Sequence, residues 1–284
     1  MKAIDSHIHF STRKGYLIAD QAMRDAMEKY YRMKVVFKTE QEMAQDFISM
    51  DIKAVLLPVD AEVSRGWPFV GNDYAAGLVK QFPQAFIGSF AGVDPWKGKM
   101  AIKEVRRAVK ELGMIGVKFQ QAIQEFFPDD HRFYPLWEEI ASLGVPIVLH
   151  CGTTGAGAGM PGGGGFRLKF TRPIPHMDDL ACDFPNLTII MAHPGWPWVE
   201  EQIAVLLHKP NVFLDLSGWA PRYFPESLKR EINGRLQDKV LYGSDYPEIS
   251  PKRWLEEFEQ GGYKSEVIEK VLLKNAQRVL KLKV

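Results

Sequence analysis

Residues 145–150 read VPIVLH, a short apolar run that contains a proline and ends in a histidine. A run of this length, rich in β-branched side chains, predicts a strand that is covered on both faces. Seven similar runs lie before and after it in the chain, at intervals of about 25 to 50 residues. The eight predicted strands are Ala3–His9, Lys53–Val59, Ala85–Val93, Ile115–Gln120, Pro146–His150, Leu187–His193, Val212–Ser217 and Val240–Asp245.

Helical patterns alternate with these runs, which predicts an α/β protein with a parallel sheet. Eight such units in 284 residues predict a single-domain (β/α)8 TIM barrel over residues 1–284. We expect two insertions, one at about residues 11–50 with extra helical structure and a glycine-rich one at about 151–175. The predicted helices include Lys99–Leu112, Phe133–Leu143 and Ser265–Leu282, the last with Ser265 as its N-cap.

The composition disfavours several classes of partner. Lys plus Arg number 36 and Asp plus Glu number 35, so no global field attracts nucleic acid or an anionic membrane surface. No segment approaches the roughly 20 apolar residues of a membrane span, and the first ten residues lack a signal-peptide core. We therefore expect a cytoplasmic protein that acts on small molecules. Cys151 and Cys182 lack the spacing of a structural zinc site, and we expect two reduced thiols.

Polar residues stand at the predicted carboxyl ends of several strands, where barrel enzymes hold their reactive groups. The first strand ends in His-Ile-His at residues 7–9, and alternation along a strand points both imidazoles to one face. His150, His193 and Asp245 end three further strands. Each alone could be a satisfied core residue, but such a cluster without a cation would leave buried polar groups unpaired. Together they predict one bound divalent metal ion.

The order of motifs along the whole chain resembles the amidohydrolase superfamily. Within it, the chain is similar to the amidohydrolase-2 branch, which includes aminocarboxymuconate-semialdehyde decarboxylase and related metal-dependent TIM-barrel hydrolases. The resemblance rests on DSHIH at 5–9, GVKFQ at 116–120, VPIVLHCG at 145–152, AHPGWPW at 192–198, NVFLDLSGW at 211–219 and LYGSDYP at 241–247.

The resemblance implies a role for each strand-end residue. It implies that His7, His9 and His150 are metal ligands, that Asp245 is a ligand or a catalytic base, and that His193 contacts the metal-bound water or the substrate. Zinc is the metal we expect, with manganese or iron as alternatives. Lys118 ends the fourth strand, and we interpret it as a catalytic anchor for substrate or oxyanion charge, the alternative being an ion pair with a strand-end carboxylate.

Aromatic and basic residues after the strand ends are candidates for substrate binding. Trp196, Trp219, Arg222 and Arg167 could line the pocket and bind a carboxylate, although packing on the rim or a solvated surface position is the ordinary role of such residues. The glycine run at 152–165 is interpreted as a mobile lid or as a simple flexible connection.

Polar groups near the strand ends could also orient the metal ligands. Asp5, Asp215 and Ser244 are candidates for hydrogen bonds to the ligand side chains.

The sequence leaves three functions open. The first is a hydrolase, in which metal-activated water attacks an ester, lactone, thioester or amide of a small substrate that can carry a carboxylate. The second is a nonoxidative, metal-dependent decarboxylase of an aromatic or unsaturated carboxylic acid, and the third is a catalytically silent binding barrel. The resemblance also suggests a homodimer.

Overall fold

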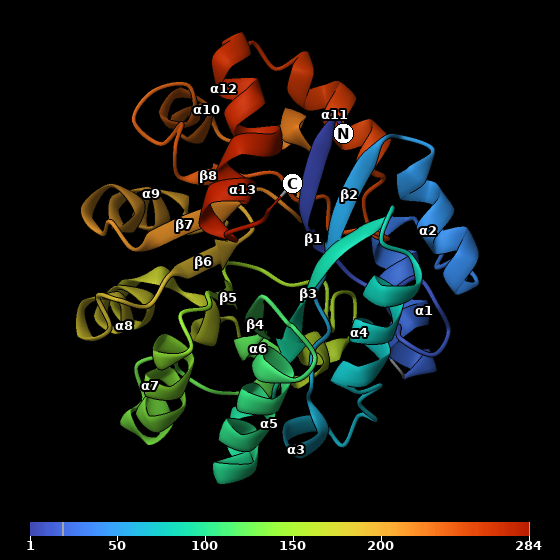
Figure 1. The fold of residues 1–284 in the computed structure, drawn as a ribbon, viewed down its shortest axis with the longest axis vertical. Coiled ribbons are helices and arrows are strands. Elements are labelled where there is room, and N and C mark those ends of the chain that lie inside the picture. The colour runs from blue at the N-terminus through green and yellow to red at the C-terminus, as the bar shows by residue number, and fades with distance from the viewer. Residues whose placement is uncertain (19, 284) are drawn as a thin grey trace.

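The computed structural model describes residues 1–18 and 20–283 and shows a (β/α)8 TIM barrel (Figure 1). All pairings in the eight-stranded sheet are parallel and follow chain order, as the sequence predicts. The strands are β1 Ala3–Ile8, β2 Ile52–Leu56, β3 Phe86–Gly92, β4 Gly116–Phe119, β5 Ile147–His150, β6 Ile189–Ala192, β7 Val212–Asp215 and β8 Val240–Leu241.

The barrel closes between β8 and β1 by backbone hydrogen bonds. Ser6 N donates to Tyr242 O at 2.9 Å, and His9 N donates to Tyr246 O at 2.7 Å. Asp245 N donates to His7 O at 3.0 Å, so the two candidate ligands lie side by side across this seam. β8 is shorter than predicted because the chain leaves extended geometry after Leu241, and Asp245 has a φ of +64°.

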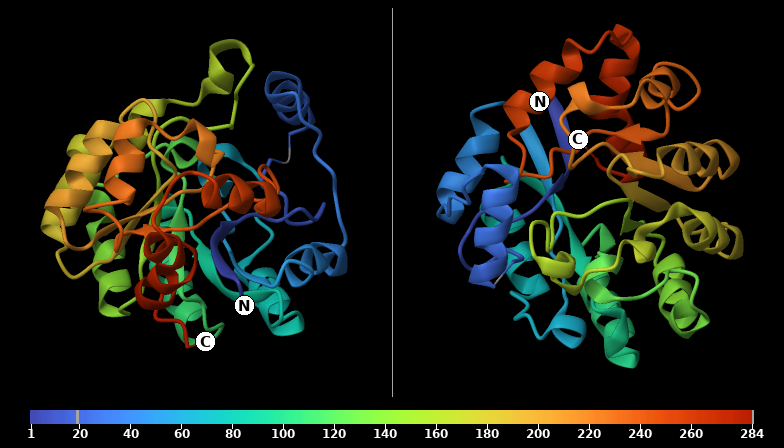
Figure 2. Two further views of the ribbon diagram at one scale, coloured as in Figure 1. Left: turned by 90° about the horizontal axis from the view of Figure 1, so that it is seen from above. Right: turned by 180° about the vertical axis from the view of Figure 1, so that it is seen from behind.

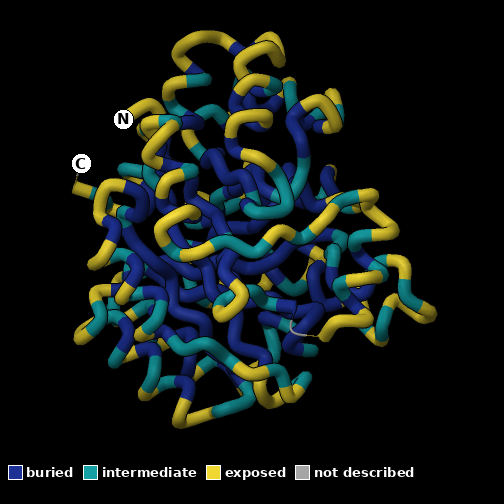
Figure 3. The backbone as a smooth tube through the Cα atoms, turned by 90° about the vertical axis from the view of Figure 1, so that its right-hand side faces the viewer, coloured by how far each residue is buried: buried dark blue, intermediate teal, exposed yellow. Residues whose placement is uncertain are grey.

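Helices cover the outside of the barrel, and buried backbone runs through its centre (Figure 3). Inside, Ile4, Val55, Phe90 and Ile190 belong to one buried cluster. Gly116 faces the Phe90 ring so closely that a Cβ there would lie 1.9 Å from it. The helices are α1 Gln21–Tyr31, α2 Glu40–Ile48, α3 Glu62–Arg65, α4 Asn72–Gln81, α5 Lys99–Lys110, α6 Gln121–Gln124, α7 Tyr134–Ser142, α8 Asp178–Asp183, α9 Val199–His208, α10 Glu226–Ile232, α11 Pro251–Glu259, α12 Ser265–Glu269 and α13 Asn275–Val279.

The last helical segment differs from the prediction in two ways. A π-helical stretch at Lys270–Lys274 separates α12 from α13, because the carbonyl oxygen of Val271 accepts a hydrogen bond from Tyr242 N at 2.9 Å. The N-cap is Lys264 rather than Ser265, since Lys264 holds the extended conformation that precedes the first helical residue.

The glycine-rich insertion at 151–175 and helix α1 of the insertion at 11–50 lie at the end of the barrel opposite the chain termini, whereas α2 packs beside β2 (Figure 2). Residues 11–50 contain α1 and α2, and residues 151–175 contain only short helical turns. Among the described residues, we find no helix with the length and apolar character needed to cross a bilayer.

Candidate metal centre

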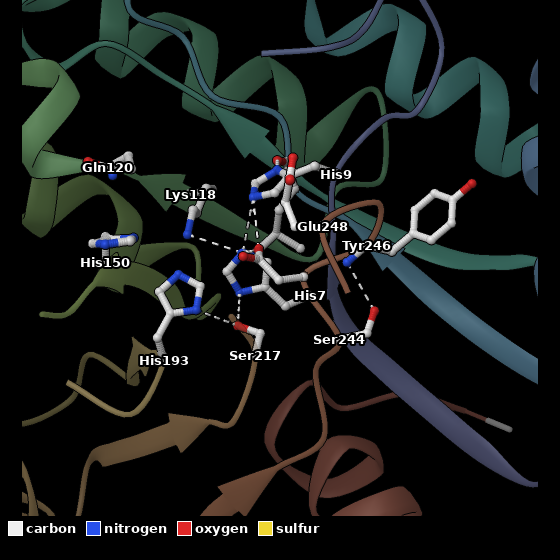
Figure 4. Close-up of polar contacts among 12 residues, drawn as sticks. His7, His9, Lys118, Gln120, His150, His193, Ser217, Ser244, Tyr246 and Glu248 are labelled. Carbon is white, nitrogen blue, oxygen red and sulfur yellow. Dashed lines mark hydrogen bonds and ion pairs between the residues drawn. The ribbon is translucent and has the colours of Figure 1, made fainter. Parts of the chain in front are cut away.

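Three side-chain atoms converge at the mouth of the barrel, at the ends of β1 and β8 (Figure 4). His7 Nε2 lies 3.4 Å from His9 Nε2 and 3.5 Å from Asp245 Oδ1. His9 Nε2 lies 3.4 Å from the same carboxylate oxygen. The alternation of β1 therefore brings both imidazoles to one point, as the sequence predicts.

The partners of the other ring nitrogens determine which atoms carry hydrogens. His9 Nδ1 lies 2.8 Å from the carbonyl oxygen of Leu57, which can only accept, so Nδ1 carries the proton and donates. His7 Nδ1 donates in the same way to Asp215 Oδ2 at 2.9 Å. In the neutral rings, both Nε2 atoms thus present lone pairs.

Asp245 Oδ1 faces these lone pairs and is buried without a hydrogen-bond partner. Three acceptor atoms that face one another in a buried site are unfavourable unless a cation lies between them. Two imidazoles and a carboxylate are also ligands that suit zinc, manganese or iron. The residues present therefore fit the divalent metal ion that the motif implies.

The charges of the site match this interpretation. Burial lowers the pKa of His7 to about 3, with help from the Lys118 ammonium, so the ring is neutral near pH 7. Burial alone would raise the pKa of Asp245, but His193, His9 and His7 in their protonated forms attract the carboxylate more strongly and hold its pKa well below its usual range. His7 and Asp245 are thus in their metal-binding forms at neutral pH.

Lys118 supplies a buried cation at the end of β4. Its side chain is almost fully buried, and Nζ lies 3.4 Å from His7 Nε2. Burial lowers its pKa to about 8, so the amine is still mostly protonated at neutral pH. The position suits the predicted role of a charge anchor beside the metal ligands.

Asp215 and Ser217 at the end of β7 orient two of the histidines. Ser217 Oγ lies 2.9 Å from His193 Nδ1 and 3.0 Å from His7 Nδ1, and it donates a short hydrogen bond to Asp215 Oδ1. Asp215 occupies the orienting position expected for it. The sequence alone does not single out Ser217, although alternation along β7 places it on the same face as Asp215.

Asp5 and Ser244 act on the backbone rather than on the ligand side chains. Asp5 Oδ1 accepts from Ser244 N at 2.9 Å and from His7 N at 3.3 Å, which ties together the two segments that carry His7 and Asp245. Ser244 Oγ accepts from Tyr246 N at 3.0 Å. Burial raises the pKa of Asp5 to about 7.

His150 lies beside the converging atoms but is engaged elsewhere. Its Nε2 donates to the carbonyl oxygen of Thr153 at 2.9 Å, and its ring packs against His193 with centroids 4.5 Å apart. In the described chain, the groups with metal-binding geometry are His7, His9 and Asp245, and His7, His193 and Asp215. The ligand role of His150 stays a prediction.

The predicted substrate-binding residues lie on the rim. Trp196 is 53% exposed, and its ring centroid lies 6.4 Å from that of Trp219. Arg222 and Arg167 are largely exposed and pair with Glu257 at 3.7 Å and Glu125 at 3.8 Å. Substrate contact by these four residues stays a prediction.

Comparison with known proteins places this site in a family. The amidohydrolase family matches residues 4–282, which is nearly the whole chain. The chain belongs to the amidohydrolase family. Its curated relatives include a decarboxylase of Emericella nidulans, orsB, which is 27% identical over 258 residues and 75% of each chain. The 2-amino-3-carboxymuconate-6-semialdehyde decarboxylase of Dictyostelium discoideum is 26% identical over 219 residues, 66% of this chain and 60% of that protein.

Solved structures share the fold of this amidohydrolase. An uncharacterised TIM-barrel protein of Bordetella bronchiseptica superposes with a TM-score of 0.77 at 23% identity and covers 99% of both chains. A dihydroxybenzoic acid decarboxylase of Polaromonas sp. JS666, with bound manganese and the inhibitor 2-nitroresorcinol, superposes with a TM-score of 0.66 at 19% identity, over 98% of this chain and 96% of that one. At these identities, the likeness establishes the fold.

Proposed function

We propose that this amidohydrolase-family enzyme is a metal-dependent, nonoxidative decarboxylase of an aromatic or unsaturated carboxylic acid. The observation that carries the proposal is the similarity to two named decarboxylases, over 75% and 66% of the chain. The sequence alone puts hydrolysis first, whereas the named relatives favour decarboxylation. The site is compatible with decarboxylation, because the buried Lys118 ammonium lies beside the candidate metal ligands His7, His9 and Asp245.

The reaction breaks the bond between the carboxyl carbon and the substrate, releases carbon dioxide and forms a carbon–hydrogen bond in its place. His7, His9 and Asp245 would hold the metal, with His150 as a further candidate ligand. The metal, when bound, supplies positive charge that orients substrate oxygens and stabilises the electron pair left by the departing carbon dioxide.

Two residues of the chain act on the substrate in this proposal. The Lys118 ammonium pairs with an anionic oxygen of the acid and fixes its orientation. His193 Nε2 takes up a proton from water and transfers it to the carbon that loses carbon dioxide. Ser217 holds His193 Nδ1, which leaves Nε2 on the side of Lys118 and His150 (Figure 4).

Isotope-labelled turnover distinguishes this reaction from hydrolysis. The protein is reconstituted separately with manganese and with zinc, and is given hydroxybenzoates, unsaturated dicarboxylates, esters and lactones. We expect carbon dioxide release from an acid. The decarboxylated product should contain one deuterium when the reaction runs in heavy water and no oxygen-18 when it runs in oxygen-18-labelled water. An Asp245→Asn variant serves as the blank. Oxygen-18 in the product of an ester or lactone, without carbon dioxide release from any acid, would establish hydrolysis instead.

A further inference from the structure

A cavity at the barrel mouth shares His9 with the metal site. Its walls come from the chain after β1, the chain after β2 and the loop between α3 and α4. His9 directs Nε2 toward Asp245 and Nδ1 toward Leu57, which lines the cavity. The ring therefore lies between the metal-binding atoms and this space, which we call the His9 cavity. The lining side chains include Phe10, Tyr16, Leu57, Val59, Trp67 and Phe69.

The polar groups around the His9 cavity are already engaged. Tyr16 lines the cavity, but its hydroxyl donates to Glu248 Oε1 at 2.9 Å. Lys14 also lines it, and its ammonium lies 4.7 Å from the centre of the Tyr74 ring. Most of the lining side chains are apolar or aromatic, and an apolar group would lose no hydrogen bond on entering.

The aromatic walls are braced from behind, so the cavity is formed before a ligand arrives. Phe166, from the glycine-rich insertion, packs on Trp67 with ring centroids 6.2 Å apart. The Phe10 ring lies so close to Gly15 that a Cβ there would be 2.6 Å from it. The start of the insertion at 11–50 thus lines the cavity, and the glycine-rich insertion supports one wall through Phe166. Preformed walls reduce the entropy cost of binding.

We propose that the His9 cavity is the subsite for a short apolar substituent, such as a methyl group, on the acid whose carboxylate lies at the metal site. The proposal rests on the proposed function, because it takes the reacting group to lie beside His7, Asp245 and Lys118. It adds the substrate class: an aromatic or unsaturated acid that carries an apolar substituent away from the carboxylate.

Binding of an unreactive analogue tests the subsite independently of turnover. The probes are 2-nitroresorcinol, which has no carboxylate to lose, and its 4-methyl and 5-methyl derivatives. Binding to the manganese-loaded protein is measured by calorimetry. We expect at least one methyl derivative to bind about tenfold more tightly than the parent, the gain typical of one methyl group in a fitted apolar pocket.

Two variants locate the effect. Val59→Phe fills the His9 cavity and should abolish the preference for the methyl derivatives over the parent compound. Val63→Phe makes the same change at a side chain that is 56% exposed and outside the cavity, and should keep the preference. If Val59→Phe does not fold, Val59→Ile adds one methylene and should reduce the preference.

The outcomes separate the subsite from the reaction. Equal binding of all three probes, failure of all three to bind, or a preference that survives filling the cavity would overturn the subsite. A methyl preference that depends on Val59, found together with no carbon dioxide release from the corresponding hydroxybenzoates, would support the subsite and count against decarboxylation. Carbon dioxide release without a methyl preference would support decarboxylation and count against the subsite.

Discussion

The two halves of the barrel mouth use their buried carboxylates in opposite ways. On the side of β2 and β3, Asp60 Oδ2 accepts from Lys97 Nζ at 2.5 Å and Oδ1 accepts from Glu62 N at 3.2 Å. Asp94 likewise accepts from two backbone amides, those of Val63 and Trp96. Both carboxylates are fully used within the fold, and they fix the loops that follow the strands.

On the side of β1 and β8, the carboxylate of Asp245 has a buried oxygen, Oδ1, that no hydrogen bond satisfies. Asp245 has a φ of +64°; His193, which follows β6, has a φ of +74°. Non-glycine residues in this region of φ and ψ cost free energy, which the surrounding hydrogen bonds must offset. The half with Asp60 and Asp94 therefore stabilises the fold, whereas the half with Asp245 is arranged for a ligand.

The largest expected effect comes from exchanging one carboxylate in each half. Asp245→Asn should lose bound metal and reduce turnover about 10³-fold or more, because it removes an anionic ligand and leaves an amide at its place. Metal content by mass spectrometry and carbon dioxide release measure the two losses.

Asp60→Asn is the matched control for that exchange. It should keep metal and turnover near the wild-type values but lower the free energy of unfolding by about 1–3 kcal/mol, because the buried partner of Lys97 is weakened. If Asp245→Asn retained a full equivalent of metal while Asp60→Asn lost it, the two halves would have been assigned the wrong way round.

Metal addition should stabilise the folded protein only through the site at β1 and β8 that contains Asp245. At free metal of about one hundred times the dissociation constant, the free energy of unfolding should rise by roughly 2.7 kcal/mol. Chemical denaturation with and without chelator measures the gain. It should be the same in Asp60→Asn and absent in Asp245→Asn. A wild-type protein with no such gain would contradict the interpretation of the three facing acceptors.

The sequence predicts the fold and the convergence of His7, His9 and Asp245 because both depend largely on local patterns. The alternation of side chains along β1, which places His7 and His9 on one face, and the position of Asp245 shortly after the last apolar run follow from local sequence. The early end of β8 and the π-helical turn depend on long-range contacts, such as that of Tyr242 with Val271, which no local pattern contains. The His9 cavity is built from loops whose approach to one another also requires the tertiary structure.

A smaller effect should follow from loosening the seam between β1 and β8. Asp5→Leu removes the oxygen that accepts from His7 N and Ser244 N, and should weaken metal binding about 10- to 100-fold. Asp5→Asn keeps an acceptor oxygen at that position and should recover most of the affinity. A loss confined to stability, with the same metal affinity in both variants, would make Asp5 purely structural.

The smallest of these effects concerns Ser217, whose hydroxyl contacts both His7 and His193. Ser217→Ala removes the hydroxyl between Asp215 and His193 but leaves the direct bond from Asp215 to His7. Metal affinity should therefore change little, whereas kcat should fall about tenfold, because His193 loses the partner that orients it for proton transfer. The two measurements belong together: an equal fall in metal affinity and kcat would mean that Ser217 acts through His7, and would remove the argument that His193 handles the proton.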